Sequence, residues 1–279
     1  DKDSSTSYSA VIAIPGIDRI FLHNPGANDT FTGKDLDLSL IKEAALFHFG
    51  YPPIMAQMYA AGGGELVRIF KTVKEAGCMT SMDMAAVDEQ SEAGRADWES
   101  ILEKTLPYVD FFLPSIEEVC YMLDKDKYHA LQKKAEGRDV TEALSIEEDA
   151  APLADRILQM GCKLAIIKCG AAGFYYKTGK KEAFEELEKR SGLDFSTFWD
   201  KEGFEKSYVP DAVISGTGAG DTTIAAFLTA MIQGCPFERC LQLAAATGAS
   251  CVAAVDALSG LKSFDELADR IDKGWAKNE

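Results

Sequence analysis

The sequence predicts an α/β fold with a mainly parallel central sheet. Three short apolar runs, at 44–49, 109–113 and 163–169, lack the alternation of a half-exposed strand. Such runs are typical of strands that are buried on both faces of a parallel sheet. Helical patterns, with apolar residues three or four positions apart, separate these runs. Strands that alternate with helices in this way build a parallel sheet with helices packed against it.

The first elements of the chain predict a hairpin, followed by a helix between two strands. Residues 8–14 and 19–23 are short β-type runs joined by "PGID", which is a turn signal. The strand at 44–49 comes next, and a weaker strand signal covers 78–84. Helical spacing between these two strands is shown by Leu66, Ile69, Phe70 and Val73.

The middle of the chain continues the alternation. Helical patterns at 98–106 and 116–123 flank the strand at 109–113, and Ser115 is the expected N-cap of the second helix. Residues 157–160 end a further helix. These patterns place one helix before and one after the buried strand, as a parallel sheet requires.

Beyond this point the signals are mixed. The run "GFYYKTG", from Gly173, predicts a strand that turns back on the strand at 163–169. Two charged stretches interrupt the alternation. Residues 125–148 are expected to form a surface excursion, and residues 180–206 a short helix that covers another part of the molecule.

Composition excludes several classes of protein. The formal net charge is −16 and the sequence shows no basic stripe, so a nucleic-acid partner is not expected. No apolar run reaches the roughly eighteen residues of a membrane span. The seven cysteines are scattered without a C-x-x-C pair, which argues against zinc and indicates reduced thiols in a cytoplasmic protein. The chain does not begin with Met, and we expect it to be a piece of a longer protein.

The stretch "SGTGAGD", at 215–221, carries the most specific chemical signal. A helical stripe follows it directly, so Gly216, Gly218 and Gly220 lie at the N-terminal mouth of a helix. Free backbone N–H groups and the positive end of the helix dipole point outward there. Glycines let a ligand approach that backbone. The combination predicts an anion site, and phosphate is the usual anion.

Asp221 stands beside this anion site. Its carboxylate would repel an anion, so we expect Asp221 to have a specific function there. It could act as a general base toward a hydroxyl group, or bind a metal; the structural alternative is an N-cap, a position that Asp favours. Other phosphate and nucleophile motifs do not match. The P-loop, G-x-G-x-x-G, H-R-D, D-F-G and G-x-S-x-G patterns are absent from the sequence.

At these residues the sequence resembles the PfkB, or ribokinase-like, carbohydrate kinase family. The family signature D-T-x-G-A-G-D is similar to "SGTGAGD", with the G-A-G-D core intact and the first acid replaced. Four further segments agree in order along nearly the whole chain: "NPGAND" at 24–29, "DFFLPSIEEV" at 110–119, "IKCGAAG" at 167–173 and "AAATGASCVAAVDALSG" at 244–260. Family members open with βαβ units that carry a Gly-Gly pair and a sugar-binding acidic residue. This sequence starts at the segment that resembles the lid, so these substrate contacts are not carried over.

The resemblance implies a role for particular residues. Asp221 is the expected base, and the backbone of Gly218, Ala219 and Gly220 the anion hole. Glu118 is expected near magnesium together with Ser115, although Ser115 stands where the family has Asn. Nucleotide contacts are expected from Lys168, Gly170 and Gly173, and a substrate contact from Asn28.

Each of these residues also has a structural interpretation. Glu118 is otherwise a solvated helix residue, Ser115 an N-cap, and Lys168 a cap on a strand end. Gly170, Gly173 and Asn28 suit turns. The small residues at 244–249 serve either helix packing or adenine access. Asp83, at a strand end, either orients a ligand or is a turn acid.

As a whole, the resemblance implies a ribokinase-like three-layer sandwich with a small β lid, of which residues 8–33 are the expected remnant, in one domain over 1–279. It implies ATP-dependent phosphorylation of a sugar, nucleoside or similar alcohol, with Mg²⁺ and a monovalent cation such as K⁺. A homodimer through the lid is also implied. The alternatives are a non-catalytic sugar or nucleotide sensor on the same fold, and a dinucleotide-dependent oxidoreductase.

Overall fold

The computed structural model of the chain describes residues 1–12, 20–138 and 140–278. At its centre is a six-stranded sheet with the order β3-β4-β5-β6-β7-β8. Strands β3 to β6 are parallel, while β7 and β8 are antiparallel to their neighbours. The strands are β3 (Leu46–Phe49), β4 (Met79–Met82), β5 (Phe111–Phe112), β6 (Leu164–Lys168), β7 (Gly173–Thr178) and β8 (Glu202–Lys206). The predicted α/β fold with a mainly parallel sheet is confirmed.

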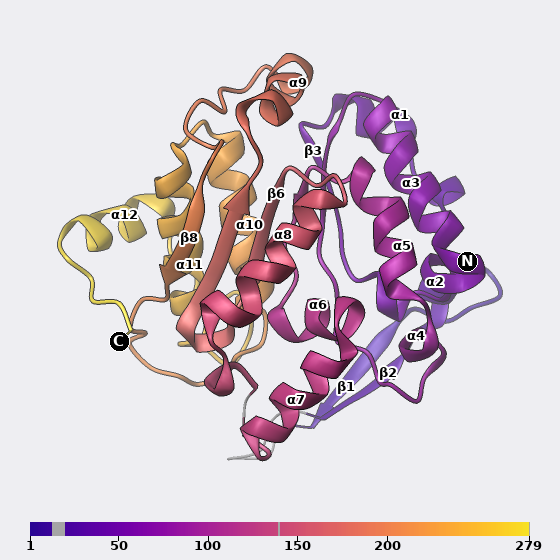
Figure 1. The fold of residues 1–279 in the computed structure, drawn as a ribbon, viewed down its shortest axis with the longest axis horizontal. Coiled ribbons are helices and arrows are strands. Elements are labelled where there is room, and N and C mark those ends of the chain that lie inside the picture. The colour runs from indigo at the N-terminus through magenta and orange to yellow at the C-terminus, as the bar shows by residue number, and fades with distance from the viewer. Residues whose placement is uncertain (13–19, 139, 279) are drawn as a thin grey trace.

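Helices cover both faces of the sheet (Figure 1). One layer contains α3 (Gly64–Glu75), α5 (Trp98–Thr105), α6 (Ile116–Leu123) and α8 (Ala151–Gln159). The other contains α9 (Lys181–Ser191), α10 (Ala219–Ile232), α11 (Phe237–Cys251) and α12 (Phe264–Asp272). The remaining helices are α1 (Leu38–Glu43), α2 (Ala56–Tyr59), α4 (Glu92–Arg95) and α7 (Lys125–Ala135). Within the described ranges, no helix is long and apolar enough to cross a membrane.

The sheet separates two hydrophobic cores. Adjacent residues of a strand point to opposite faces. Accordingly, Phe112 packs with Phe70 and Trp98 in one core, and Phe111 packs with Phe184 and Phe227 in the other. These aromatic side chains are almost fully buried. The apolar runs at 109–113 and 163–169 therefore correspond to strands that are covered on both sides. For the run at 44–49 this prediction is wrong in part, because β3 lies at an edge of the sheet and His48 is exposed.

The predicted hairpin is present as a separate two-stranded sheet. Strand β1 (Tyr8–Ile12) runs antiparallel to β2 (Ile20–Asn24), with Tyr8 opposite Asn24. All five residues of β1 are exposed. The predicted "PGID" turn lies outside the described residues. Because none of the hairpin side chains that the structure describes belongs to either core, the hairpin is an appendage of the sandwich.

The two charged stretches contain more regular structure than their sequences predict. Residues 125–148 include helix α7, which buries Leu131 and Ala135, so the expected surface excursion is wrong in part. The short helix expected within 180–206 is confirmed as α9. The same stretch also supplies the edge strand β8, which the sequence did not predict.

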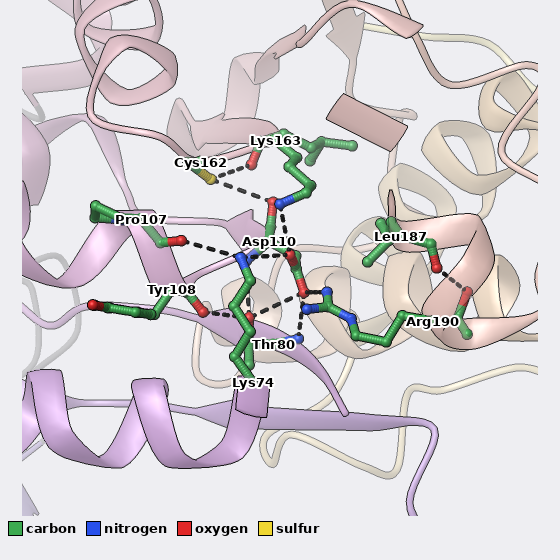
Figure 2. Close-up of polar contacts among 11 residues, drawn as sticks. Lys74, Thr80, Pro107, Tyr108, Asp110, Cys162, Lys163, Leu187 and Arg190 are labelled. Carbon is green, nitrogen blue, oxygen red and sulfur yellow. Dashed lines mark hydrogen bonds and ion pairs between the residues drawn. The ribbon is translucent and has the colours of Figure 1, made fainter. Parts of the chain in front are cut away.

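A buried ionic cluster ties the sheet together at the amino ends of its strands (Figure 2). Its centre is Asp110, just before β5, whose carboxylate is fully buried. Ion pairs join it to Lys163 at 3.1 Å, Lys74 at 3.4 Å and Arg190. The amide of Thr80 donates to the same carboxylate at 3.0 Å. The cluster thus links β4, β5 and β6 to helices on both faces of the sheet.

Candidate active site

The glycine stretch forms the N-terminal mouth of α10. The helix begins at Ala219, with Gly218 as N-cap at φ +79°. A Cβ atom on Gly218 would lie 2.3 Å from the Cβ of Ala257, so both the backbone conformation and the close contact require glycine. The helix starts three residues earlier than its apolar stripe predicts, at Ala219 rather than Thr222. Asp221 is therefore inside the first turn, and the alternative that it serves as the N-cap is wrong.

The predicted anion hole lies in this first turn. The amide of Ala219 donates to the carbonyl of Gly216 at 3.3 Å, which is a long bond within the turn. The first α-helical bond runs from the amide of Thr222 to the carbonyl of Gly218 at 2.8 Å. At Gly220, a Cβ atom would lie 3.8 Å from the Lys168 ammonium, so the lysine side chain crosses the mouth of the helix.

Lys168 is held in place by Asp83. Its Nζ lies 2.8 Å from both carboxylate oxygens of Asp83. The two side chains are only 12% and 3% exposed. Burial raises the pKa of the Asp83 carboxyl, and the Lys168 ammonium opposes that shift. The carboxyl ends of β4 and β6 therefore meet in a buried ion pair next to Gly220, a pairing that the sequence did not reveal.

Two residues near the end of β3 complete this edge of the sheet, and sequence reasoning missed both. The Tyr51 hydroxyl donates to a carboxylate oxygen of Asp221. The Nδ1 atom of His48 lies 3.0 Å from the Ser81 hydroxyl oxygen. Desolvation of its ring, together with the nearby Lys168 ammonium, lowers the pKa of His48 to about 4, so the imidazole is neutral at pH 7. His48 lies near the end of β3 and Tyr51 just after it, and this position at the carboxyl end of a strand was the only available signal.

Ser115 and Glu118 form the start of α6. The predicted N-cap is confirmed, and the amide of Ser115 donates to the Glu118 carboxylate at 2.7 Å. Ser115 also forms a parallel bridge with Lys168, which brings this helix start to the same edge. No group of three or more acidic, His or Cys side chains that could hold a metal occurs in the described part of the chain. Mg²⁺ suits this place if substrate phosphates and water supply most of its ligands, with one carboxylate from the protein.

Gly170 and Gly173 have steric reasons to be glycine. Gly170 has φ +59°, and a Cβ atom there would lie 2.8 Å from the Thr141 hydroxyl oxygen. Gly173 has φ +130°, and its Cβ atom would lie 2.1 Å from the carbonyl oxygen of Glu205. Their structural interpretation as turn glycines therefore holds. Both also line the cavity described next, so a ligand contact remains compatible with these roles.

A cavity of about 550 Å³ opens beside the mouth of α10. Its lining includes Lys168, Gly170, Gly173, Gly220, Ala245 and Ala249. This volume is ordinary for a small-molecule site. The small residues of α11 serve two purposes: Ala244 and Ala246 are fully buried in the core, whereas Ala245 and Ala249 face the cavity.

Asn28 lies apart from these contacts. Its side-chain amide donates to the Ser7 hydroxyl at 3.1 Å, in the short helical turn Gly26–Asp29. This contact ties it to the segment that leads into the hairpin. A direct contact with substrate remains a prediction.

Comparison with known proteins identifies similar sequences. The sequence profile of the family described as "pfkB family carbohydrate kinase" matches residues 1–263. The chain is 24% identical over 243 residues to an uncharacterized sugar kinase of Archaeoglobus fulgidus, covering 87% of this chain and 75% of that protein. It is also 36% identical to the ribokinase of Arabidopsis thaliana over 89 residues, which are 32% of this chain and 21% of that protein.

Solved structures share the fold. The Arabidopsis thaliana ribokinase complexed with ribose and ATP has a TM-score of 0.66 at 18% identity, covering 96% of this chain and 69% of that chain. The Xylella fastidiosa fructokinase with bound ATP has a TM-score of 0.67 at 17% identity, covering 97% and 74%. These likenesses confirm the ribokinase-like fold. With the profile match over most of its length, the chain belongs to the pfkB family of carbohydrate kinases.

Proposed function

We propose that this protein transfers the γ-phosphoryl group of ATP to a hydroxyl group of a sugar or a sugar-like small molecule. One observation carries this proposal most directly. The carboxylate of Asp221 lies in the first turn of α10, next to the glycine backbone and the cavity that Gly220 and Lys168 line. The proposed base, the proposed anion site and a cavity of suitable size are thus neighbours. A sugar or nucleoside substrate agrees with the names of the similar proteins.

Each part of the site has a role in this reaction. ATP would occupy the cavity, with its phosphates toward the mouth of α10. Asp221 would accept the proton of the substrate hydroxyl as its oxygen attacks the γ-phosphorus. The Lys168 ammonium and the backbone donors at 218–220 would stabilise the charge on the transferred oxygens. Positioning and charge stabilisation of this kind are most of what phosphoryl transfer requires.

Glu118 would lie near the magnesium ion that accompanies ATP, which adds positive charge at the phosphates. We expect Glu118→Gln to raise the Mg²⁺ requirement roughly tenfold, as loss of an indirect metal contact does. Gln can still accept the bond from the Ser115 amide, so the start of α6 and the melting temperature should be retained. Magnesium titrations of initial rate, at fixed ATP, measure this. An unchanged titration curve would remove Glu118 from the metal site.

The hairpin would act as a lid and as a dimer contact. Cross-strand pairing puts Tyr8, Ile12 and Leu22 on one face, and these side chains are 60%, 43% and 59% exposed. A second copy of the chain, presenting the same face, would cover them. We expect sedimentation to show a dimer that Leu22→Lys dissociates, while Val11→Lys, on the opposite face, leaves it intact. A monomer at every concentration of the wild-type protein would contradict the dimer.

Two further elements of the proposal follow from the family. A monovalent cation such as K⁺ would assist the reaction. A cytoplasmic location agrees with the seven cysteines, which are all free thiols.

The proposed activity itself is tested by incubating the protein with Mg-ATP and a panel of sugars and nucleosides, and by searching for phosphorylated products by mass spectrometry. A sensor would bind one of these compounds without forming any product.

A further inference from the structure

The hydroxyl of Tyr51 lies on the carboxylate that is proposed to be the base. Tyr51 follows β3, whereas Asp221 lies 170 positions later in α10, so the fold alone brings them together. We propose that Tyr51 is a positioning residue for Asp221: it donates a hydrogen bond to Oδ1 and leaves Oδ2 for the hydroxyl group of the substrate. This inference rests on the proposed function.

Asp221 needs such a support because little else restrains it. Its side chain is exposed in the first turn of α10. Among the hydrogen bonds of the described residues, Tyr51 is the only side-chain partner of Asp221. Without that bond, the carboxylate would exchange among rotamers, and only some of them would face the substrate. A base must lie within hydrogen-bonding reach of the proton it takes, so this freedom would lower the rate.

Tyr51 is itself held firmly. It is half-buried, and the next two residues, Pro52 and Pro53, are buried. Each proline fixes its own φ angle and restricts the residue before it. The carbonyl of Tyr51 also accepts a hydrogen bond from the amide of Ile54 at 3.1 Å. The hydroxyl therefore extends from a restrained backbone just after a strand of the central sheet.

Tyr51 also remains a donor under all working conditions. Burial, followed by the hydrogen bond to Asp221, raises the pKa of the Tyr51 hydroxyl well above its ordinary value, and the charges of Asp83 and Glu118 add to this shift. The phenol is therefore neutral, keeps its proton, and does not compete with Asp221 for the proton of the substrate.

The two carboxylate oxygens of Asp221 have different roles in this arrangement: Oδ1 accepts the hydrogen bond from Tyr51, and Oδ2 faces the substrate. In the proposed reaction, the substrate proton passes to Oδ2 of Asp221 while the substrate oxygen forms a bond to the γ-phosphorus. The bond from that phosphorus to the leaving oxygen of ADP breaks. Tyr51 neither gains nor loses a proton during these steps. Its effect should therefore appear in the catalytic rate rather than in the binding of ATP.

The test is Tyr51→Phe, which removes only the hydroxyl group. We expect kcat to fall about tenfold or more, in line with the strength of a hydrogen bond to a charged group. The KM for ATP should change less than twofold. The matched control is Tyr59→Phe: Tyr59 is also half-buried, and its ring packs against Trp98 with the centroids 6.2 Å apart. This variant should keep the wild-type kcat.

A double-mutant cycle separates positioning from a merely structural role. If Tyr51 acts through Asp221, Tyr51→Phe should lose its effect on kcat in the Asp221→Asn background. A kcat within twofold of wild type for Tyr51→Phe, or the same loss in both backgrounds, would overturn the role of Tyr51 while leaving the proposed function intact. Wild-type turnover of the single variant Asp221→Asn would overturn the base itself, and with it this inference.

Discussion

Replacing Asp221 with asparagine should lower turnover by about 10²–10⁴-fold, the usual contribution of general base catalysis. A carboxylate can accept the proton of the substrate hydroxyl, and an amide cannot. The glycine backbone and Lys168 stay in place, so ATP should still bind, with unchanged or slightly tighter affinity once a negative charge is removed. Steady-state rates and nucleotide titrations by calorimetry measure the two effects separately.

The structure also supplies a control for this change. Asp221 is not the N-cap, so asparagine should disturb α10 only through the lost interaction with the helix dipole and a weaker hydrogen bond from the Tyr51 hydroxyl. Asp265→Asn makes the same exchange in the first turn of α12, away from the site. Its effect on melting temperature should match that of Asp221→Asn, with turnover unchanged. Turnover of Asp221→Asn within threefold of wild type, at equal melting temperature, would leave Asp221 without a catalytic role.

The largest loss of stability is expected at the opposite edge of the sheet. Asp110→Asn removes the one negative charge that Lys74, Lys163 and Arg190 share in a buried cluster (Figure 2). Burial lowers the pKa of Lys74, and Asp110 opposes that shift, so the carboxylate helps to keep this lysine charged. Breaking a buried ion pair from one side costs about 3–5 kcal/mol. Urea denaturation should show a decrease of that size in the free energy of unfolding.

An exposed ion pair serves as the control for the buried cluster. Asp211→Asn breaks the contact with Arg270, in which the carboxylate is 67% exposed. Because water already screens this pair, the change should leave the free energy of unfolding nearly unchanged. If Asp110→Asn were no more destabilising than Asp211→Asn, the cluster would not hold the sheet together. Asp110 lies at the edge of the sheet opposite the candidate site, so the catalytic rate per folded molecule should persist in Asp110→Asn.

The fold was predictable where burial leaves a strong pattern. The strands β5 and β6 are covered on both faces, and their sequences are apolar runs. Strand β3 lies at an edge of the sheet, but it was still predictable because its run contains three large apolar residues around the exposed His48. Strand β8 has no such pattern because it lies at the edge of the sheet, with polar residues in the sequence EGFEK and partial exposure throughout. Helix α7 was missed for a related reason, since it buries only two residues of an otherwise charged segment.

The candidate site, too, could be predicted from the sequence only in part. The residues that share one local motif, at 218–221, could be predicted because glycines and an acid at the start of a helix are adjacent in the sequence. The partners of these residues could not. Lys168 and Asp83 are 85 positions apart, and their pairing depends on which strands are neighbours in the sheet. Tyr51 carries no local signal of its bond to Asp221, because only the three-dimensional fold brings the two side chains together.

The most direct test of the proposed function follows the γ-phosphoryl group itself. The wild-type protein and Asp221→Asn are incubated with Mg²⁺, candidate sugars or nucleosides, and ATP whose γ-phosphoryl oxygens carry a heavy isotope. We expect the wild type to yield a phosphorylated sugar or nucleoside that retains the labelled oxygens, and the variant to yield at most about one hundredth as much. Binding of ATP and of a sugar by the wild type, with no label in any organic product, would contradict a kinase and indicate a sensor.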